Sequence, residues 1–357
     1  HLQGRLHLSP IVRNELLRVE AASGNLRWRL PLEGGIPLAP VVVGNTAWVG
    51  TRGGRLYRVD LASGNSPGYF TIPQSLGTPP AIDPQRNLIY QVGLESNLYI
   101  LEAGDETTCR AVVYLGHAPD TITAPPLLID QLYLLIPQNT GLKYSELRVY
   151  KLQEEGASVA LAQVESLEGQ VHTPPQREAN AAVVATDAAG LYMYAIGDSQ
   201  AAKPLSQIAR QAGGTSLPVA PQLRLRPDHL WVADRMLQCY AFQEATGNFT
   251  PVWQRYAGDV FLQPLQSAGP ALVHSRRVPG KPGVVVAALG AEQGDTFWET
   301  VLAAPSATGP LVDPDARTVA ALTTGGALFE VPLDQLNRRN VVSQPAQQVA
   351  ASEALSP

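Results

Sequence analysis

The strongest structural signal in this chain is the stretch from residue 54 to residue 65, which reads Gly-Arg-Leu-Tyr-Arg-Val-Asp-Leu-Ala-Ser-Gly-Asn. Tyr57, Val59 and Leu61 alternate there with the charged Arg58 and Asp60. This two-residue period is typical of a half-buried β-strand rather than a helix. Glycine opens the stretch and Ala-Ser-Gly-Asn closes it, and both are typical of turns. The stretch therefore predicts one strand between two turns.

The same phrase returns along the rest of the chain. Clear copies occupy residues 16–25 and 97–104, and weaker ones occupy residues 190–195, 237–247 and 326–331. With two less regular copies added to these five and the first stretch, we count eight in all. A repeat that runs from residue 16 to residue 331 indicates one array of similar units rather than two unrelated domains.

Prolines mark a second period, with a mean spacing of 45 residues. The marking residues are Pro40, Pro80, Pro126, Pro175, Pro221, Pro264 and Pro310. Proline suits the start of a strand, where no ladder N–H is needed. A short apolar strand, a turn and a second strand follow these prolines, and the repeated phrase and a less regular segment supply a third and a fourth. Four short antiparallel strands per unit of this length predict the blade of a β-propeller.

The number of blades depends on which signal is counted. Seven prolines mark seven innermost strands, whereas the third-strand phrase occurs eight times. We predict an all-β propeller of seven four-stranded antiparallel blades, in which strands from the two termini share the closing blade and so remove free edges. An eighth blade built from residues 1–32 is the alternative. The propeller is expected over residues 1–332, and residues 333–357 are expected to form a tail or linker.

Composition favours a folded protein and excludes several classes of partner. Hydrophobic residues make up 45% of the chain and charged residues 16%, unlike a disordered chain. The formal net charge is −5, and no Lys/Arg cluster suggests nucleic-acid binding. No apolar run approaches the roughly 20 residues of a membrane-spanning helix. Residues 1–13 lack a signal-peptide pattern, so we interpret the chain as a mature or excised fragment.

Two stretches resemble a known repeat. Residues 56–64 (Leu-Tyr-Arg-Val-Asp-Leu-Ala-Ser-Gly) and 20–28 (Glu-Ala-Ala-Ser-Gly-Asn-Leu-Arg-Trp) resemble the repeat of the pyrroloquinoline-quinone-like propellers. That superfamily contains quinoprotein alcohol dehydrogenases, the propeller lipoprotein of the outer-membrane β-barrel assembly machinery, and sensor or scaffold propellers. The resemblance extends over nearly the whole chain and is strongest at residues 14–64. It implies the fold and leaves the activity open.

The resemblance also implies how blades dock. In this superfamily a small residue, a glycine and a terminal tryptophan hold neighbouring blades together, and Ala22, Gly24 and Trp28 match that pattern. Trp253 matches it with a longer spacing, and Trp298 stands alone. We therefore expect Trp28 to be buried between two blades.

The resemblance to the enzymes of the superfamily would imply a quinone held over a calcium ion, and usually a disulfide between adjacent cysteines. Cys109 and Cys239 are far apart and fall in different predicted blades. They are therefore expected to remain unpaired thiols. No quinone or calcium ligands can be placed, so we predict no catalytic residues, no cofactor and no metal site.

The residues just before the prolines are expected to crowd one mouth of the central channel. This set is Ile36, Thr78, Ile122, Thr123, His172, Ser216, Phe261 and Ala307. It is neutral and partly apolar, which disfavours catalysis by paired carboxylates or a metal. Asp120, His172 and Asp259 are the only ionisable candidates, and they come from separated blades. We interpret them as loop-capping or water-facing residues.

A recognition surface is the more favoured prediction. Residues 137–146 form the longest predicted insertion, a loop between the second and third strands of one blade. Exposed loops on a rigid scaffold are the usual place for recognition. Leu142 and Tyr144 are expected to anchor a protein partner, because aromatic and large apolar side chains dominate interface energetics. A hairpin tip without a partner is the alternative.

These patterns lead to one preferred function and one alternative. The preferred hypothesis is a non-enzymatic scaffold or sensor propeller, one module of a larger exported or membrane-associated assembly in the bacterial periplasm or cell envelope. A cytoplasmic location is the alternative. The competing function is a small-molecule or quinone-binding propeller that uses the channel mouth around His172.

Overall fold

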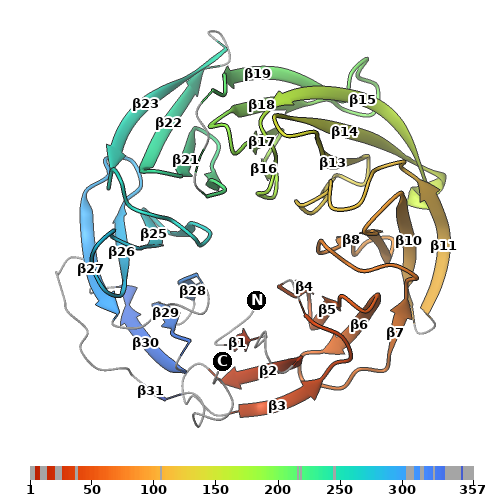
Figure 1. Ribbon diagram of the computed structural model, residues 1–357, viewed down its shortest axis with the longest axis horizontal. Coiled ribbons are helices and arrows are strands. Elements are labelled where there is room, and N and C mark those ends of the chain that lie inside the picture. Colours follow the sequence, from red (N-terminus) through yellow and green to blue (C-terminus); the bar gives the residue numbers. More distant parts are fainter. Residues whose placement is uncertain are drawn as a thin grey trace.

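The computed structural model describes residues 5–8, 14–20, 26–36, 39–104, 107–214, 217, 219–243, 247–302, 309–313, 317–324, 326–333 and 347–348. These residues form eight antiparallel sheets arranged as a ring (Figure 1). Seven sheets have four strands and one has three, and each follows the order of its strands in the sequence. The predicted all-β fold with four-stranded antiparallel blades is confirmed.

The first four sheets come from the N-terminal half of the chain. The first sheet contains β1 (Arg5–Leu8), β2 (Glu15–Glu20) and β3 (Leu26–Pro31). The second contains β4 (Val41–Val43), β5 (Thr46–Gly50), β6 (Arg55–Asp60) and β7 (Gly68–Thr71). The third contains β8 (Ala81–Asp83), β9 (Leu88–Val92), β10 (Asn97–Ala103) and β11 (Thr107–Tyr114). The fourth contains β12 (Leu127–Ile129), β13 (Tyr133–Thr140), β14 (Tyr144–Gln153) and β15 (Ser158–Glu168), with the short 3-10 helix η1 (Glu154–Gly156) before β15.

The other four sheets repeat this plan. The fifth contains β16 (Gln176–Glu178), β17 (Ala181–Ala185), β18 (Leu191–Ile196) and β19 (Leu205–Gln211). The sixth contains β20 (Gln222–Leu225), β21 (His229–Ala233), β22 (Leu237–Gln243) and β23 (Asn248–Arg255). The seventh contains β24 (Gln266–Ala268), β25 (Ala271–Arg276), β26 (Val284–Gly290) and β27 (Thr296–Leu302). The eighth contains β28 (Leu311–Asp313), β29 (Thr318–Leu322), β30 (Ala327–Pro332) and β31 (Gln347–Gln348).

The preference for seven blades is wrong for the described residues, which form eight sheets. The marking prolines each precede the innermost strand of a four-stranded sheet, as predicted. The first sheet, however, has only β1 to β3, and the repeated phrase is its middle strand, β2. Prolines therefore give one fewer than the number of described sheets, because the described strands of this sheet include no inner strand that a proline marks. The eight copies of the third-strand phrase equal the number of sheets that the described residues form.

The predicted sharing of a closing blade by the two termini is not seen among the described strands. No described strand of the first sheet pairs with a strand of the eighth. The eighth sheet takes its fourth strand from β31, which lies in the segment predicted to be a tail. The first and last sheets meet instead through side chains, since Leu17 of β2 packs with Leu322 of β29 and Leu328 of β30.

The hydrophobic core lies between neighbouring sheets. One buried cluster joins Tyr90 and Ile100 of the third sheet to Leu134 and Ile136 of the fourth. The alternation seen in the sequence explains this arrangement, because a strand between two sheets buries one face against each neighbour. Burial of each large apolar side chain contributes about 1.5–3 kcal/mol.

Tryptophans dock two pairs of sheets in the same way. Trp28 of β3 donates a hydrogen bond from Nε1 to the carbonyl oxygen of Leu61 in the second sheet (3.0 Å), and the indole is half-buried there. Trp253 of β23 donates from Nε1 to the carbonyl oxygen of Ala291 in the turn after β26 (3.1 Å). The expected position of Trp28 between blades is confirmed, although its burial is partial.

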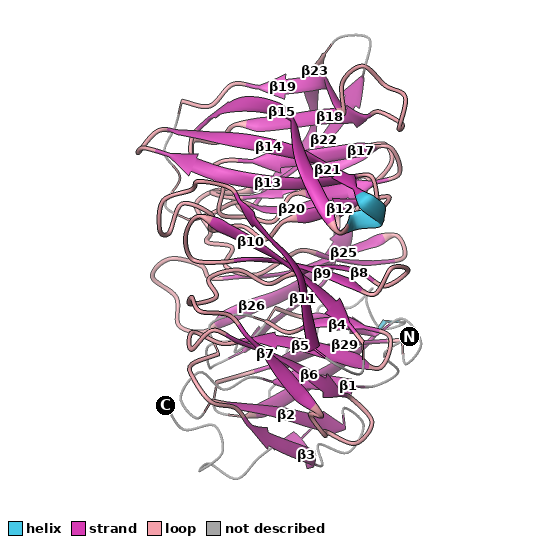
Figure 2. Ribbon diagram, turned by 90° about the vertical axis from the view of Figure 1, so that its right-hand side faces the viewer, coloured by secondary structure: helices cyan, strands magenta, loops and turns pink. Residues whose placement is uncertain are grey.

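The order of the strands gives the ring two different faces. In an antiparallel meander, the hairpin between the second and third strands lies on the same side as the connection that enters the sheet. Backbone bonds tie these two segments together, for example from Asn139 N–H to Thr121 C=O (2.7 Å) and from Asp187 N–H to Gln170 C=O (2.9 Å). We call this side the connection face. In the side view of Figure 2, the β13–β14 hairpin projects from one face of the disk.

Candidate functional site

The predicted insertion at residues 137–146 is mostly strand rather than loop. β13 continues to Thr140 and β14 begins at Tyr144, and these two residues pair across the hairpin. Only residues 141–143 form the turn, where Gly141 has a φ of 65°. At this tip Leu142 is 91% exposed and Tyr144 is 58% exposed. The sequence prediction of a loop is therefore wrong in its secondary structure, whereas the two side chains are exposed as expected.

A buried asparagine explains why this segment stays extended. The side chain of Asn139, 6% exposed, donates a hydrogen bond from Nδ2 to Thr123 Oγ1 (3.0 Å). Its Oδ1 accepts a bond from the N–H of Val171 (2.8 Å). Asn139 thus joins the hairpin to the two connections that enter the fourth and fifth sheets.

His172 lies in the same hydrogen-bonded group. Its Nδ1 is 2.9 Å from Thr123 Oγ1, and its Nε2 is 3.8 Å from Asp187 Oδ2. Asp187 Oδ1 accepts a bond from the N–H of Gln170 (2.6 Å), and Gln170 Nε2 donates to the carbonyl oxygen of Gly141 (2.7 Å). The connection before the fifth sheet therefore links His172 to the turn that carries Leu142.

These contacts bring the three sequence-predicted partner residues to one region. Leu142, Tyr144 and His172 all lie on the connection face, at the junction of the fourth and fifth sheets. The association of His172 with Asn139 and Asp187 was missed, because these residues are distant in the sequence and carry no local motif.

The Thr123, His172 and Asp187 side chains do not have the geometry of a catalytic triad. In a triad the carboxylate hydrogen-bonds one ring nitrogen and the nucleophile hydrogen-bonds the other. Here the carboxylate distance of 3.8 Å exceeds a hydrogen bond. The hydroxyl of Thr123 also donates to the carbonyl oxygen of Val171 (2.9 Å). These three residues stabilise the connection that enters the fifth sheet, and they leave the polar imidazole of His172 half-exposed.

The predicted ring of residues around the channel mouth is wrong for four of its eight members. Four of its members are buried, namely Ile36, Thr78, Ile122 and Phe261. The apolar members belong to core clusters between neighbouring sheets; Phe261, for instance, packs with Trp231 of the sixth sheet. Thr123 and His172 remain accessible. Ser216 and Ala307 lie outside the described residues.

Asp120 and Asp259 have different environments. Asp120 is exposed, as expected, with a φ of 59°. Asp259 contradicts the expectation, because its side chain is only 12% exposed and its Oδ2 accepts a bond from Arg276 Nε (2.7 Å). Arg276 also donates from Nη2 to Glu299 Oε2 (2.8 Å), and its guanidinium lies 3.8 Å from the ring centre of Tyr256. Sequence reasoning missed this group, because Arg276, Glu299 and Tyr256 form no local motif with Asp259.

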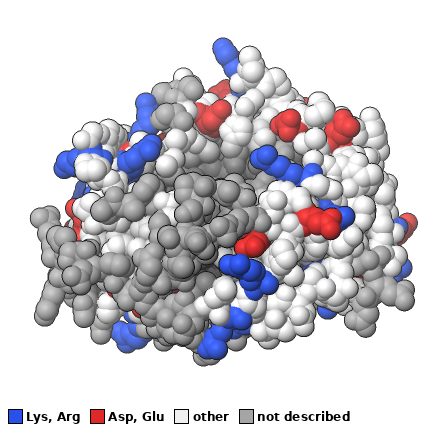
Figure 3. All heavy atoms as spheres, turned by 60° about the horizontal axis from the view of Figure 1, so that its bottom comes forward, with Lys and Arg blue, Asp and Glu red and all other residues white. Residues whose placement is uncertain are grey.

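Surface charge and metal-binding residues are sparse. In the view of Figure 3, Lys and Arg atoms are scattered among Asp and Glu atoms on a mostly uncharged surface, with no large patch of one sign on the described residues. Within the described ranges no group of three or more His, Cys, Asp or Glu residues is placed to hold a metal ion. No helix in those ranges is long and apolar enough to cross a membrane.

Comparison with known proteins supports the repeat and the fold. Residues 3–67 match the family model described as outer membrane protein assembly factor BamB. This match confirms the resemblance to the quinone-type propeller repeat over the N-terminal part of the chain. A search of curated proteins finds no match.

Three solved structures illustrate the similarity of fold. BamB from Moraxella catarrhalis is 12% identical with a TM-score of 0.55, over 81% of this chain and 76% of that one. The computationally designed Ika8 protein is 13% identical with a TM-score of 0.61, over 85% and 86% of the two chains. A functionally unknown protein from Desulfotomaculum acetoxidans DSM 771 is 10% identical with a TM-score of 0.56, over 82% and 94%. At such identities the likeness shows the fold alone.

Proposed function

We propose that this chain is a non-enzymatic propeller that binds another protein, as a scaffold or sensor module of a larger exported or membrane-associated assembly in the bacterial envelope. The observation that carries the proposal is the hairpin tip, where Leu142 is 91% exposed and Tyr144 is 58% exposed. The BamB match adds support, because that protein is described as an outer membrane assembly factor.

The energetics of the tip favour a protein partner. Burial of a large apolar side chain contributes about 1.5–3 kcal/mol. A partner that buried both Leu142 and Tyr144 would therefore gain a substantial part of its binding free energy from these two side chains. The base of the hairpin is fixed by Asn139, which bonds both neighbouring connections. A tip held in place before binding loses less conformational entropy when the complex forms.

The small-molecule alternative has one observation in its favour. His172 is half-exposed beside Thr123 and Asp187, which gives a polar group that could orient a ligand. Calorimetry with a quinone in the presence of calcium tests this function. Stoichiometric heat that is lost in His172→Ala would support it and would count against a purely scaffolding role.

Site-specific crosslinking tests the protein-binding proposal. A photo-reactive amino acid at position 142, introduced in cells of the source organism, is expected to give one discrete adduct after illumination. The control is position 252, since Val252 is 47% exposed on the outermost strand β23 of another sheet. The adduct should disappear when Tyr144→Ser is added. Equal products from positions 142 and 252, or none from position 142, would contradict the proposal.

A further inference from the structure

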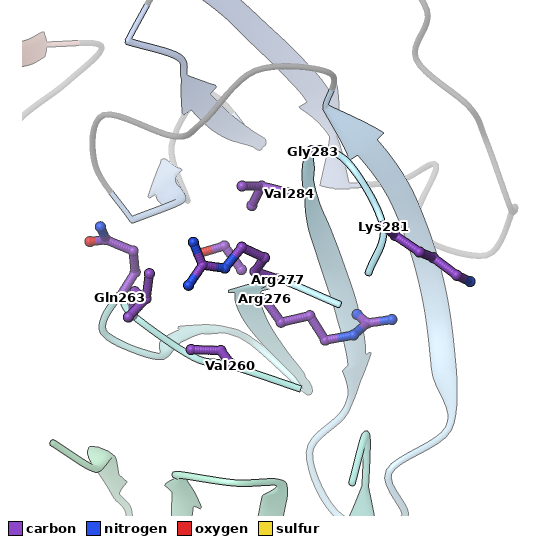
Figure 4. A pocket seen from close by; sticks show the side chains of 9 residues that line it. Val260, Gln263, Arg276, Arg277, Lys281, Gly283 and Val284 are labelled. Atoms are coloured by element: carbon purple, nitrogen blue, oxygen red, sulfur yellow. The ribbon is translucent and has the colours of Figure 1, made fainter. Parts of the chain in front are cut away.

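A pocket on the connection face of the seventh sheet carries a separate inference. It has a volume of about 200 Å³ and lies between the β25–β26 hairpin and the connection before β24 (Figure 4). Its lining residues are Val260, Leu262, Gln263, Ser275, Arg276, Arg277, Lys281, Gly283 and Val284. Leu142 and Tyr144 lie in the fourth sheet, so this pocket is distinct from the hairpin tip described above.

The frame of the pocket is rigid. Val260 and Arg277 exchange two backbone hydrogen bonds, each 2.9 Å long, which join the connection to the hairpin. Arg276 is only 6% exposed and is held by Asp259 and Glu299. The two carboxylates balance the charge of Arg276 and hold its side chain in place. Arg276 is therefore a rigid part of the pocket lining and is not free to pair with a ligand. A preformed pocket of this kind binds without first ordering its own side chains.

Two other cations at the pocket have no counter-charge. Arg277 and Lys281 are exposed, and neither has a carboxylate partner among the residues that the structure describes. The lining also contains three apolar side chains, Val260, Val284 and Leu262, and the last of these is 51% exposed. In Figure 4 the Arg277 side chain extends toward Gln263, whereas Lys281 points away from the pocket and adds only to the positive charge at its rim. The Arg277 charge beside an apolar lining complements a group that is both acidic and apolar.

The remaining polar groups favour a peptide. Gln263 and Ser275 line the pocket, and neither side chain has a hydrogen-bond partner in the described part of the chain. An amide and a hydroxyl can pair with the N–H and C=O groups of a peptide backbone. A fatty acid would satisfy the cations and the apolar lining but would leave both groups unpaired. The volume is also below the roughly 300–1,000 Å³ typical of cofactor sites.

We infer that this pocket binds an acidic peptide segment in which Asp or Glu adjoins a large apolar residue. The carboxylate pairs with Arg277, and the apolar side chain packs against Val260 and Val284. Bidentate pairing with the Arg277 guanidinium fixes the orientation of the carboxylate. This inference names a second binding site and does not depend on the role of the hairpin tip.

Selection from a random peptide library tests the inference. Heptapeptides displayed on phage are selected on the parent protein, on Arg277→Glu/Lys281→Glu and on Leu142→Ser/Tyr144→Ser. The parent should enrich sequences with Asp or Glu beside Leu, Ile, Val or Phe. The charge-reversed variant should lose them, whereas the hairpin variant should keep them. Absence of acidic sequences, or their persistence on the charge-reversed variant, would overturn the inference.

A direct binding measurement completes the test. The most enriched peptide, carrying a fluorescent label, is titrated by anisotropy, and the charge-reversed variant should bind it at least about tenfold more weakly. Affinity should fall as salt rises. If charge reversal impairs folding, judged by thermal melting, Arg277→Gln/Lys281→Gln replaces it with the same expectation. Displacement of the peptide by octanoate at equal concentration would assign the pocket to fatty acids instead.

Discussion

The ring of Trp28 lies so close to Gly64 of the next sheet that a β-carbon at position 64 would come within 2.5 Å of the indole. Trp253 and Gly294 repeat the relationship, at 2.8 Å. Both tryptophans sit at the β-bulge of an outermost strand, opposite Arg18 and Cys239 respectively. In both pairs, a tryptophan from one blade packs over a glycine turn of the following blade and so holds the two blades together.

Gly64→Ala should therefore destabilise the protein by about 2–5 kcal/mol. Gly64 has a φ of +76°, which costs alanine about 1–2 kcal/mol, and overpacking against Trp28 adds about 1–3 kcal/mol. Gly44→Ala is the matched control, because its φ is +58° but nothing lies within 4 Å of the added carbon. Urea denaturation measures both variants. Equal losses would show that the indole does not limit position 64.

Closure of the ring can be tested at Leu17. This side chain is 3% exposed and packs against Leu322 and Leu328 of the last sheet. Leu17→Ala should cost about 2–5 kcal/mol of unfolding free energy. Because the first and last sheets meet there, the variant should also form aggregates through freed strand edges, visible by size-exclusion chromatography. Leu26→Ala, on an exposed residue of the same sheet, should change stability by no more than about 0.5 kcal/mol. A monomeric Leu17→Ala protein with parental stability would contradict closure through this contact.

The sequence predicted strands correctly where the repeated pattern lies within a few neighbouring residues. The alternation at residues 54–65 and the prolines correctly located β6 and seven innermost strands. The proline count differs from the number of described sheets at the first sheet, because the described strands there include no inner strand that a proline marks. The exposure of Leu142 was predictable from its place at a tip. The contacts of His172 and Asp259 were not predictable, because their partners come from other segments of the chain that only the folded ring brings together.

The two cysteines should differ sharply in reactivity. Cys109 is exposed on β11, whereas Cys239 is buried on β22, in another sheet. Burial raises the pKa of the Cys239 thiol to about 12. Since the thiolate is the reactive form, a disulfide reagent at pH 8 should modify one thiol of the native protein and two after denaturation in guanidinium. Rapid loss of both native thiols, or labelling that survives in Cys109→Ser, would contradict the burial of Cys239.

His274 provides a prediction about pH. Its imidazole is fully buried, between the rings of Tyr256 and Phe261 at centroid distances of 5.1 and 5.5 Å. Neither ring nitrogen has a hydrogen-bond partner among the described residues. Burial, together with the nearby charge of Arg276, lowers the pKa of His274 from 6.5 to about 3.

The sign of the effect follows from proton binding. Below pH 6.5 the unfolded chain protonates this histidine while the folded protein keeps it neutral, so stability is complete above pH 6.5 and falls as the pH drops toward 3. The loss is about 1.4 kcal/mol per pH unit, or about 2 kcal/mol at pH 5. His274→Phe removes this titration and fills the same apolar site. The difference in unfolding free energy between pH 7 and pH 5 should therefore be about 2 kcal/mol smaller in the variant than in the parent. Other titrating groups are common to both proteins and cancel in the comparison, so an identical pH dependence would mean that His274 is protonated in the folded state.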